Sequence, residues 1–574
     1  MKLIAEWLAL LRREFSAYNF LTLQKDLLAG LTVAAVALPL ALAFGVASGA
    51  DAAAGLITAI LAGILIGFLG GSPFQISGPT GAMSAVLIVL ASRYGLSGVF
   101  VAGLLSGLIL VLLGIFRLGR IVALIPAPVI SGFTSGIAVI IALGQIDNAL
   151  GIKSPPAETV IARLSYLFSN PPQPNGYALA LTLVVILVMV IWPRLSWAAR
   201  VPGSLAAIVI ATLLVTLAGW DVPLIGSIPR SIMLENRLSW AAIPWADIDQ
   251  LIVPALSIAA LGAIESLLCG AVVGNMTGIR LHNSVELVAQ GIGNMIIPFF
   301  GGVPATAAIA RTSVNVKSGG VTRLTAILHG LILLLVALVA APLIGRVPLA
   351  ALAGVLLITA WRMNEWHAMR IFFGRRLKHA MVGFLVTLAA TVLFDLTQAI
   401  LIGFAVSTII FMLQISELQV ARQPVDPERL KQNGAAFTHP DYPISIYYLS
   451  GPLFFAAARK LLEAIEAQDG KEARIILSMR GIPLLDATGL EVLREIHHRQ
   501  GPGGLLLTGL QPRVEAILQR AGFLAELGEN AIFWSSDQAI LSLDGTPPHL
   551  RPVAAPDAIE PVITPHEERT DMQL

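Results

Sequence analysis

Long apolar runs separated by short polar stretches make up the first 414 residues of the chain. Runs such as 31–50, 52–74, 178–192 and 324–344 contain no Asp, Glu, Lys or Arg. Each approaches the roughly 20 residues that an α-helix needs to span a bilayer, whereas the strands of a membrane β-barrel would be shorter and would alternate in polarity. The pattern predicts a polytopic α-helical membrane protein with 14 transmembrane segments, near residues 27–49, 51–71, 79–92, 97–116, 126–147, 177–192, 203–219, 251–277, 284–300, 309–318, 323–344, 348–361, 380–394 and 396–414.

The composition of the chain agrees with this prediction. Of the 574 residues, 56% are hydrophobic and 13% are charged, whereas soluble domains carry roughly 25% charged residues. The chain has one cysteine, Cys269, so it can form no disulfide within itself, and a cysteine-based metal cluster is excluded. The net charge of +2 gives no reason to expect a nucleic-acid partner, and no cofactor is expected.

Positively charged residues gather on one side of the predicted segments. An even number of segments puts both termini on the same side of the membrane, and cytoplasmic loops carry an excess of Lys and Arg. With the N-terminus inside, the cytoplasmic loops contain Arg117, Arg120, Arg194, Arg200, Arg280, Lys317, Arg323, Arg370, Arg375, Arg376 and Lys378, and the external loops contain Arg93, Lys153, Arg163, Arg230, Arg237 and Arg346. The bias predicts cytoplasmic termini, and residues 1–25, which show no cleavage site of a signal peptide, are expected to be a retained cytoplasmic tail.

Two of the predicted segments are too short to cross a bilayer. Residues 79–92 and 309–318 would each cover about half of it at roughly 1.5 Å per residue. Each follows a stretch interrupted by Gly and Pro, 70–81 or 301–312, and each is the third segment of its half of the chain. Short, broken segments at matching positions predict two inverted repeats of seven segments, with a binding site where the two half-helices meet.

A half-helix that begins inside the membrane leaves backbone N–H groups unpaired at its N-terminus, which favours an anion. Two such ends, near Thr80 and Ala310, would face each other in this fold. Arg311 at the second end adds a charge that can pair with carboxylate or sulfate, so the site is predicted to bind a small anion. The alternative is that Arg311 lies in a loop and extends to the membrane interface near Lys317.

Glu265 lies in the middle of the segment 251–277, where a lone carboxylate must pair, take up a proton or bind a cation. Because Arg311 would repel a cation, we expect Glu265 to carry a coupling proton rather than bind Na⁺. The alternative is a structural carboxylate that accepts hydrogen bonds from neighbours such as Ser266 or from backbone donors.

The pattern changes after Leu413, where the apolar runs end. The transmembrane domain is therefore expected to span residues 26–414, and the polar residues 415–440 to form a linker. Residues 441–545 alternate short β-branched runs with segments of helical period, which predicts a cytoplasmic α/β domain. The tail 546–574 is polar and rich in Pro and is expected to be disordered.

Five stretches of the chain resemble the SulP family of anion transporters. They are "ALPLALAFGVASG", "GGSPFQISGPTGA", "GAIESLL", "ELVAQGIGNMIIPFFGG" and "TAAIARTSVNVKSGG". The resemblance extends over residues 20–545, and it implies a core domain and a gate domain, elevator-like movement, a homodimer and a C-terminal STAS domain. Within the family, the glutamate and arginine motifs look most similar to those of a C4-dicarboxylate transporter of the bacterial inner membrane.

The resemblance also implies a set of residues for the anion site. Carried over by motif, the site falls on Leu40, Phe44, Thr80, Gly81, Ile309, Ala310 and Arg311. Leu40 replaces a glutamine that animal anion exchangers often have, which argues against a polar contact there, and Ala310 replaces a serine of some relatives, so a backbone N–H would serve instead. Sodium-coupled bicarbonate members lack an arginine at the position of Arg311, which again disfavours Na⁺ coupling.

The stretch "LLDATGLEVL" (484–493) resembles the STAS signature. The signature residues here are Asp486, Ala487, Thr488 and Gly489. In anti-sigma-factor antagonists the second of these positions is a phosphorylated serine, so Ala487 removes that switch. Thr488 is expected to cap the following helix with its hydroxyl. The domain is expected to serve folding and dimerisation, or alternatively to bind a regulatory ligand or a cytosolic protein.

These features together predict a secondary active transporter that moves small anions with protons, with C4-dicarboxylates such as succinate, fumarate or aspartate as the favoured substrates. Sulfate and bicarbonate suit the same site, and an uncoupled anion channel or a sensor that signals through the STAS domain are alternatives of other classes. An enzyme is not expected, because the soluble region shows no catalytic triad, metal cluster or phosphate-binding loop. The expected partners are the small anion, protons, membrane lipids, a second copy of the chain and a cytosolic protein at the STAS domain.

Overall fold

The computed structural model describes most of the chain, namely residues 2–119, 126–154, 165–167, 169–170, 173–195, 201–226, 228–242, 248–279, 281–394, 396–416, 418–425, 444–466 and 474–543. Contacts divide the chain into two units, residues 1–407 and 408–574, and each is described by itself. The predicted tail 546–574, residues 426–443 at the predicted linker and domain start, and Arg120, Arg163, Arg200 and Arg280 of the charge pattern lie outside the described residues.

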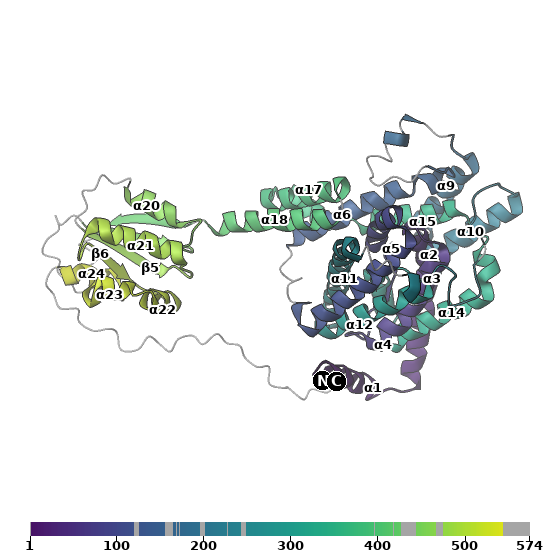
Figure 1. The fold of residues 1–574 in the computed structure, drawn as a ribbon, viewed down its shortest axis with the longest axis horizontal. Helices are drawn as coiled ribbons and strands as arrows, with labels where there is room; N and C mark the ends of the chain where they lie inside the picture. The colour runs from purple at the N-terminus through teal and green to yellow at the C-terminus, as the bar shows by residue number, and fades with distance from the viewer. Residues whose placement is uncertain are drawn as a thin grey trace. The chain divides into compact units, whose positions relative to one another are not determined.

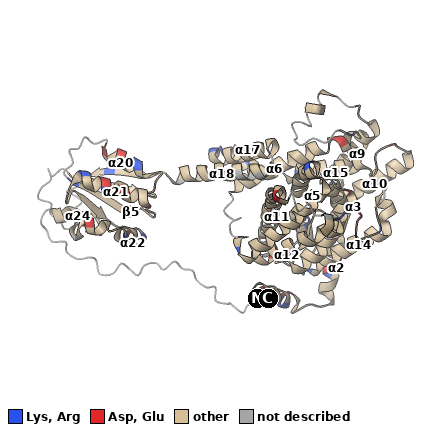
Figure 2. Ribbon diagram, in the orientation of Figure 1, with Lys and Arg blue, Asp and Glu red and all other residues tan. Residues whose placement is uncertain are grey.

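Helices make up nearly all of the first unit (Figure 1). Its first half contains α1 (Lys2–Phe15), α2 (Phe20–Ala47), α3 (Ala52–Leu61), the π-helical turn η1 (Ala62–Ile66), α4 (Gly67–Leu69), strand β1 (Ser77–Gly78), α5 (Gly81–Ile115), α6 (Ala127–Gly144), α7 (Ile146–Leu150), α9 (Gly176–Ile191), η3 (Trp192–Arg194) and α10 (Gly203–Ala218). Figure 2 shows that few charged residues interrupt these helices, as expected for surfaces in contact with lipid.

The second half of this unit begins with η5 (Trp240–Ala242) and repeats the order of elements seen in the first half. It contains α11 (Ile248–Thr277), α12 (Asn283–Ile296), η7 (Ile297–Phe300), strand β2 (Thr306–Ala307), α13 (Ile309–Lys317), α14 (Leu324–Ile344), α15 (Leu349–Met363), α16 (Trp366–Gly374), α17 (Lys378–Leu393) and α18 (Leu396–Ile415). A helix coincides with each of the predicted segments, and seven helical stretches among the described residues are long and apolar enough to cross a membrane on their own.

Three parts of this unit differ from the sequence-based expectation. The predicted segments 79–92 and 97–116 meet without a loop, because α5 is interrupted only at Gly95, whose φ of 68° is open to glycine. The predicted N-terminal tail contains the helix α1, and the predicted loop around Arg370 contains α16. Both helices are short, so neither has the long apolar run by which the spans were recognised.

The helices of the first unit pack as two groups. One group contains α2 to α5 and α11 to α14, in which α5 packs against α11 and α12, and α14 packs against α2 and α3. The other group contains α6, α7, α9, α10, α15 and α17, in which α6 packs against α15 and α17, and α9 packs against α10 and α15. We call them the core group and the gate group, and they correspond to the two domains expected from the resemblance.

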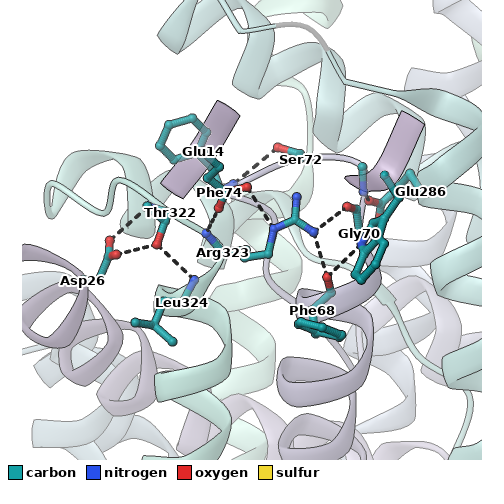
Figure 3. Close-up of polar contacts among 12 residues, drawn as sticks. Glu14, Asp26, Phe68, Gly70, Ser72, Phe74, Glu286, Thr322, Arg323 and Leu324 are labelled. Carbon is teal, nitrogen blue, oxygen red and sulfur yellow. Dashed lines mark hydrogen bonds and ion pairs between the residues drawn. The ribbon is translucent and has the colours of Figure 1, made fainter. Parts of the chain in front are cut away.

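A buried polar cluster joins the start of α2 to the turn before α14 (Figure 3). The Asp26 carboxylate accepts hydrogen bonds from the backbone N–H groups of Val321 and Thr322 at 2.8 and 3.0 Å, and from the Thr322 hydroxyl at 2.5 Å. Tyr18 lies 3.4 Å from the same carboxylate, and burial together with this negative charge raises the pKa of the Tyr18 phenol above its usual value. Arg323, beside this turn, is 1% exposed and pairs with Glu14 of α1 at 2.9 Å.

The second unit contains a five-stranded sheet with helices. Its strands are β3 (Gln419–Pro424), β4 (Ile444–Ser450), β5 (Arg474–Gly481), β6 (Leu505–Thr508) and β7 (Ile532–Phe533), in the order β3-β4-β5-β6-β7. Only the β3–β4 pair is antiparallel; the other pairs are parallel. The helices are α20 (Ala458–Glu466), α21 (Ala487–Gln500), α22 (Pro512–Arg520), α23 (Phe523–Leu527), η8 (Glu529–Ala531) and α24 (Ser536–Leu543).

The α/β fold of this unit agrees with the sequence pattern, but its first strand does not. Strand β3 lies inside the residues predicted to be a linker and pairs with β4 from Gln419 opposite Ser450 to Pro424 opposite Ser445. Nearly all of its side chains are exposed. An exposed edge strand has no buried face, so its sequence shows no apolar alternation by which it could be recognised.

Candidate functional site

Two non-helical stretches, one before α5 and one before α13, interrupt the helices of the core group, and we call them the breaks. They meet at a pair of two-residue strands. Strands β1 and β2 are antiparallel, with Ser77 opposite Ala307 and Gly78 opposite Thr306. Helix α5 begins three residues after β1, and α13 begins two residues after β2. The strand pair therefore holds the N-termini of α5 and α13 next to each other, and the positive ends of both helix dipoles lie at one place.

Arg311 lies in the first turn of α13 and is 1% exposed. Its Nη2 donates a hydrogen bond to the carbonyl of Pro79 at 2.8 Å, whereas its buried Nη1 has no hydrogen-bond partner among the described residues. A Cβ atom at Gly78 would lie 2.6 Å from Nη1, so the missing side chain of Gly78 makes room for the guanidinium. The alternative in which Arg311 extends to the membrane interface is wrong, because the side chain is buried.

Glu265 of α11 is connected to the N-terminus of α5 through the hydroxyl of Thr80. The Thr80 Oγ1 donates to Oε2 of Glu265 at 2.9 Å and accepts from the backbone N–H of Met83 at 3.3 Å, so Thr80 is also the N-cap of α5. Ser266 does not bond to Glu265; its hydroxyl lies 3.1 Å from that of Thr306. The hydroxyl that donates to Glu265 is thus that of Thr80 and not that of Ser266, and the alternative of a structural carboxylate stays open beside proton coupling.

A cavity of about 940 Å³ lies between the core group and the gate group. Every residue that the sequence predicted for the anion site and for proton coupling lines this cavity, namely Leu40, Phe44, Thr80, Gly81, Glu265, Ile309, Ala310 and Arg311. The gate wall includes Phe133, Met189, Arg362 and Glu365. Arg362 donates to the carbonyl of Met189 at 3.0 Å, and Glu365 accepts from the Ser131 hydroxyl.

The apolar members of the predicted site form the walls beside the two helix ends. Phe44 is buried, and a Cβ atom at Gly81 would lie 3.2 Å from its ring, so Gly81 permits the close approach of α2 to the start of α5. Leu40 is half-buried, and Ile309 and Ala310 at the start of α13 are exposed to the cavity. Ala310 has no side-chain donor, so only its backbone N–H can serve an anion.

Three polar residues that the sequence analysis did not single out hold the breaks in place. They are Glu286, Gln290 and Asn294, spaced by four residues along one face of α12. Asn294 donates to the carbonyl of Ala305 at 2.9 Å and accepts from the N–H of Ala305 at 2.7 Å. Gln290 donates to the Ser77 hydroxyl at 2.8 Å. Glu286 accepts from the N–H of Gly71 at 2.8 Å. The polar spacing within an apolar segment is the signal that could have identified them.

These contacts answer the main difficulty of an interrupted helix in a membrane, where every backbone polar group needs a partner. The stretch before α5 is also held by Thr312, whose hydroxyl accepts from the N–H of Ile76 at 3.0 Å, and by Asn315, which donates to the carbonyl of Phe74 at 2.8 Å. Gln75 donates in turn to the carbonyl of Ser266 at 2.7 Å. The two breaks are thus held by side chains from α11, α12 and α13.

The STAS signature lies at the start of α21 in the second unit. Asp486, with extended backbone, is the N-cap: its Oδ1 accepts from the N–H of Gly489 at 2.8 Å, and its Oδ2 accepts from the N–H of Phe455 at 3.0 Å. The prediction that Thr488 caps the helix is wrong, because Thr488 already lies inside the first turn, where its backbone is helical. Ala487 is the first residue of α21, and within the described residues no cluster of His, Cys, Asp or Glu could hold a metal ion.

Comparison with known proteins identifies the family of the chain. Residues 23–390 match the model of the Sulfate permease family, and residues 438–539 match that of the STAS domain. The chain belongs to the sulfate permease family. YvdB of Bacillus subtilis, whose name assigns it provisionally to sulfate transport, is 36% identical over 534 residues, which cover 91% of this chain and 98% of YvdB.

Two solved structures support the fold. The transmembrane domain of a cyanobacterial bicarbonate transporter, BicA, matches with a TM-score of 0.60 at 33% identity, covering 67% of this chain and 98% of that domain. The murine anion transporter Slc26a9 in its inward-facing state matches with a TM-score of 0.79 at 18% identity and 91% coverage of both chains, which shows a shared fold.

The comparisons confirm the predicted family, the helical membrane fold and the C-terminal STAS domain. Membership of this family makes the chain an anion transporter in a membrane. The relatives are named for sulfate and bicarbonate, so the dicarboxylate specificity, the proton coupling and the roles of the site residues stay predictions.

Proposed function

We propose that this protein is a secondary active transporter of the inner membrane that takes up small anions together with protons, with C4-dicarboxylates as the substrates to test first. The observation that carries the proposal is the pairing, in one cavity, of a buried arginine with an unbonded Nη1 and a carboxylate held by the adjacent helix cap. The anion would take the place next to Arg311, between the N-termini of α5 and α13.

The geometry suits an anion in three ways. The N-terminal turns of α5 and α13 both point their dipoles at the cavity, Arg311 offers a charged donor, and the apolar walls around Leu40 and Phe44 lower the local dielectric and strengthen both contacts. The cavity volume of about 940 Å³ lies at the upper end of the roughly 300–1,000 Å³ usual for ligand pockets. This volume leaves room for an anion as large as a C4-dicarboxylate.

The charges in the cavity support proton coupling. When Arg311 and Glu265 are both ionised, an anion next to Arg311 is repelled by the Glu265 carboxylate. For two unit charges about 6 Å apart in an effective dielectric constant near 20, such a repulsion is about 3 kcal/mol, or roughly a hundredfold in affinity. A proton on Glu265 removes the repulsion, so anion and proton bind best together, which is the requirement for symport.

Alternating access would come from movement of the core group against the gate group, because the cavity lies between them. The anion site belongs mostly to the core group, so an elevator-like shift of that group would carry the site across the membrane. We further propose a homodimer with cytoplasmic termini, in which the STAS domain supports folding and dimerisation. The alternative role of that domain is regulation through a cytosolic protein.

The test is uptake of radiolabelled succinate, sulfate and bicarbonate into proteoliposomes, with and without an inward proton gradient. We expect succinate uptake that rises with the gradient, that Arg311→Gln abolishes, and that Glu265→Gln uncouples from protons. Arg346→Gln, at an exposed arginine outside the cavity, is the matched control and should transport as the wild type does. Uptake that survives Arg311→Gln would refute the anion site.

The other outcomes distinguish the alternatives. The 33% identity to BicA supports bicarbonate as an alternative substrate. A measured preference for bicarbonate or sulfate would change the proposed substrate but leave the proposed site intact. Downhill flux that never accumulates the anion against its gradient would identify an uncoupled channel. Loss of a cellular response, but not of uptake, after removal of residues 430–574 would indicate a sensor.

A further inference from the structure

The N-terminal helix α1 has three faces, and among the described residues one of them makes the polar contacts with the core group. The inward face is fastened to the core group by ion pairs and by a tryptophan. Glu14 pairs with Arg323, which is 1% exposed, and Glu6 pairs with Arg117 at 2.7 Å. The Trp7 Nε1 donates to the carbonyl of Phe68 at 3.3 Å, so α1 is held at a fixed place on the core group.

Figure 3 shows the fastening at its centre. Arg323 lies between Glu14 of α1 and the end of α4, where its Nη1 donates to the carbonyls of Phe68 and Gly70 at 2.7 and 3.1 Å. The backbone N–H of Arg323 also donates to Glu14. Because Arg323 follows the end of α13 by six residues, α1 is bound to the part of the molecule that carries the anion site.

The second face of α1 is apolar and largely exposed, although the ring of Phe15 at its end packs against Tyr18. Ile4, Leu8 and Phe15 recur at spacings of four and seven residues, which places them on one side of a helix. They are 63%, 43% and 36% exposed. The surface continues onto the first turns of the membrane-spanning helix α2, which exposes Phe20, Leu21, Leu27, Leu28 and Leu31. This continuity makes lipid the environment of the apolar face.

The third face of α1 is basic. Lys2, Arg12 and Arg13 are exposed and make no ion pair with a described residue. The two acidic residues of α1, Glu6 and Glu14, are already neutralised by Arg117 and Arg323. The free charge of the helix is therefore positive, and acidic headgroups attract basic residues at a membrane surface.

We propose that α1 is an interfacial helix that binds acidic phospholipid in the leaflet bordering the N-terminal end of α2. Its apolar face enters the acyl-chain boundary, and Lys2, Arg12 and Arg13 bind the headgroup phosphates. Through the Arg323 pair, α1 then links the membrane surface to the core group and not to the gate group.

The experiment uses the full chain and does not depend on which anion is transported. An environment-sensitive thiol probe is attached at Leu8→Cys on the apolar face, or at Ala9→Cys on the exposed polar face as the matched control. The native Cys269 is 0% exposed and stays unlabelled. The protein is reconstituted into phosphatidylcholine vesicles with or without phosphatidylglycerol, and quenching by brominated lipids is compared with quenching by aqueous iodide.

Consecutive residues of a helix point about 100° apart, so Leu8 faces the acyl chains while Ala9 points away from them. The probe at Leu8 should therefore be quenched by brominated lipid at least twice as strongly as the probe at Ala9. Phosphatidylglycerol should increase the quenching of the Leu8 probe by brominated lipid further, because the probe then lies deeper in the membrane. The triple variant Lys2→Ser, Arg12→Ser, Arg13→Ser should lose this increase in quenching. Equal lipid quenching at both positions would overturn the interfacial placement. Shielding of the Leu8 probe from both quenchers would identify a protein on this face, and no response to phosphatidylglycerol would overturn the acidic-lipid assignment.

Discussion

Replacing Gly78 by Ala tests the anion site without touching a charged residue. A Cβ atom at this position would lie 2.6 Å from Nη1, 3.1 Å from Nη2 and 3.2 Å from Cζ of Arg311. Non-bonded heavy atoms settle near 3.5 to 4.0 Å, so the guanidinium must withdraw by roughly 1 Å. Its hydrogen bond to the Pro79 carbonyl, now 2.8 Å, would then be lost or strongly lengthened.

The withdrawal should weaken the contact between Arg311 and the transported anion by about the contribution of one charged hydrogen bond. A hydrogen bond to a charged group contributes about 1.5 to 3 kcal/mol, which corresponds to a roughly 10- to 150-fold loss in the transport efficiency kcat/KM at about 1.4 kcal/mol per tenfold change. The assay is initial uptake, over a range of substrate concentrations, of the anion that the wild type carries. Thermal unfolding in detergent shows whether the variant is folded.

Two comparisons make this prediction specific. Gly262→Ala is the matched control, because its Cβ atom would meet Leu110 at 3.6 Å and Met83 at 4.0 Å, which is ordinary contact. If the loss acts through the guanidinium, Gly78→Ala should cost little further in an Arg311→Lys background, which keeps the charge but removes the planar guanidinium. A folded Gly78→Ala variant that transports within about twofold of the wild type would refute the assignment of Arg311, because that change is far below the loss of one charged hydrogen bond.

Three further predictions concern the connections around the site. Glu14→Ala leaves Arg323 buried without its partner and should destabilise the protein by about 3–5 kcal/mol, whereas the exposed pair lost in Glu6→Ala should cost at most about 1 kcal/mol; equal melting temperatures of the two variants would contradict this. Thr80→Val removes both the α5 cap and the donor to the coupling carboxylate, so proton-driven uptake should fall and Thr80→Ser should restore it; unaltered uptake by the valine variant would exclude this coupling route. Asp486→Ala removes two hydrogen bonds at the start of α21 and should lower the stability of the STAS domain by about 1–2 kcal/mol, measured by hydrogen exchange of the full chain, and unchanged exchange would argue against the cap.

The sequence was most informative where a charged residue, or a Gly or Pro, lies within an otherwise apolar helical segment. Arg311 and Glu265 are charges in apolar segments, and a buried charge in a membrane is expensive enough to require a reason. The Gly and Pro residues before α5 and α13 interrupt helices that would otherwise continue. These signals are local, so the two helix ends and their arginine could be predicted before the structure was known.

The contacts that hold this site could not be predicted from the sequence in the same way. Glu14 and Arg323 are 309 residues apart in sequence, and nothing near either residue indicates the other. Strands β1 and β2 have two residues each, which is too short for any periodic pattern. The Thr488 prediction failed because Asp486 and Thr488, two positions apart, can both cap a helix, and only the backbone conformation decides between them.

The arrangement of these contacts bears on how the transporter moves. Asn294, Gln290 and Thr312 satisfy backbone or side-chain groups of the two breaks, and strands β1 and β2 join the breaks to each other. Opening the site within the core group would break several of these bonds in a medium that offers no replacement partners. Across the cavity, the gate wall opposes the site mainly with apolar side chains such as Phe133 and Ile137. Sliding along that wall would break none of the bonds that hold the breaks, so these contacts favour the proposed elevator-like movement, in which the core group moves as a rigid part.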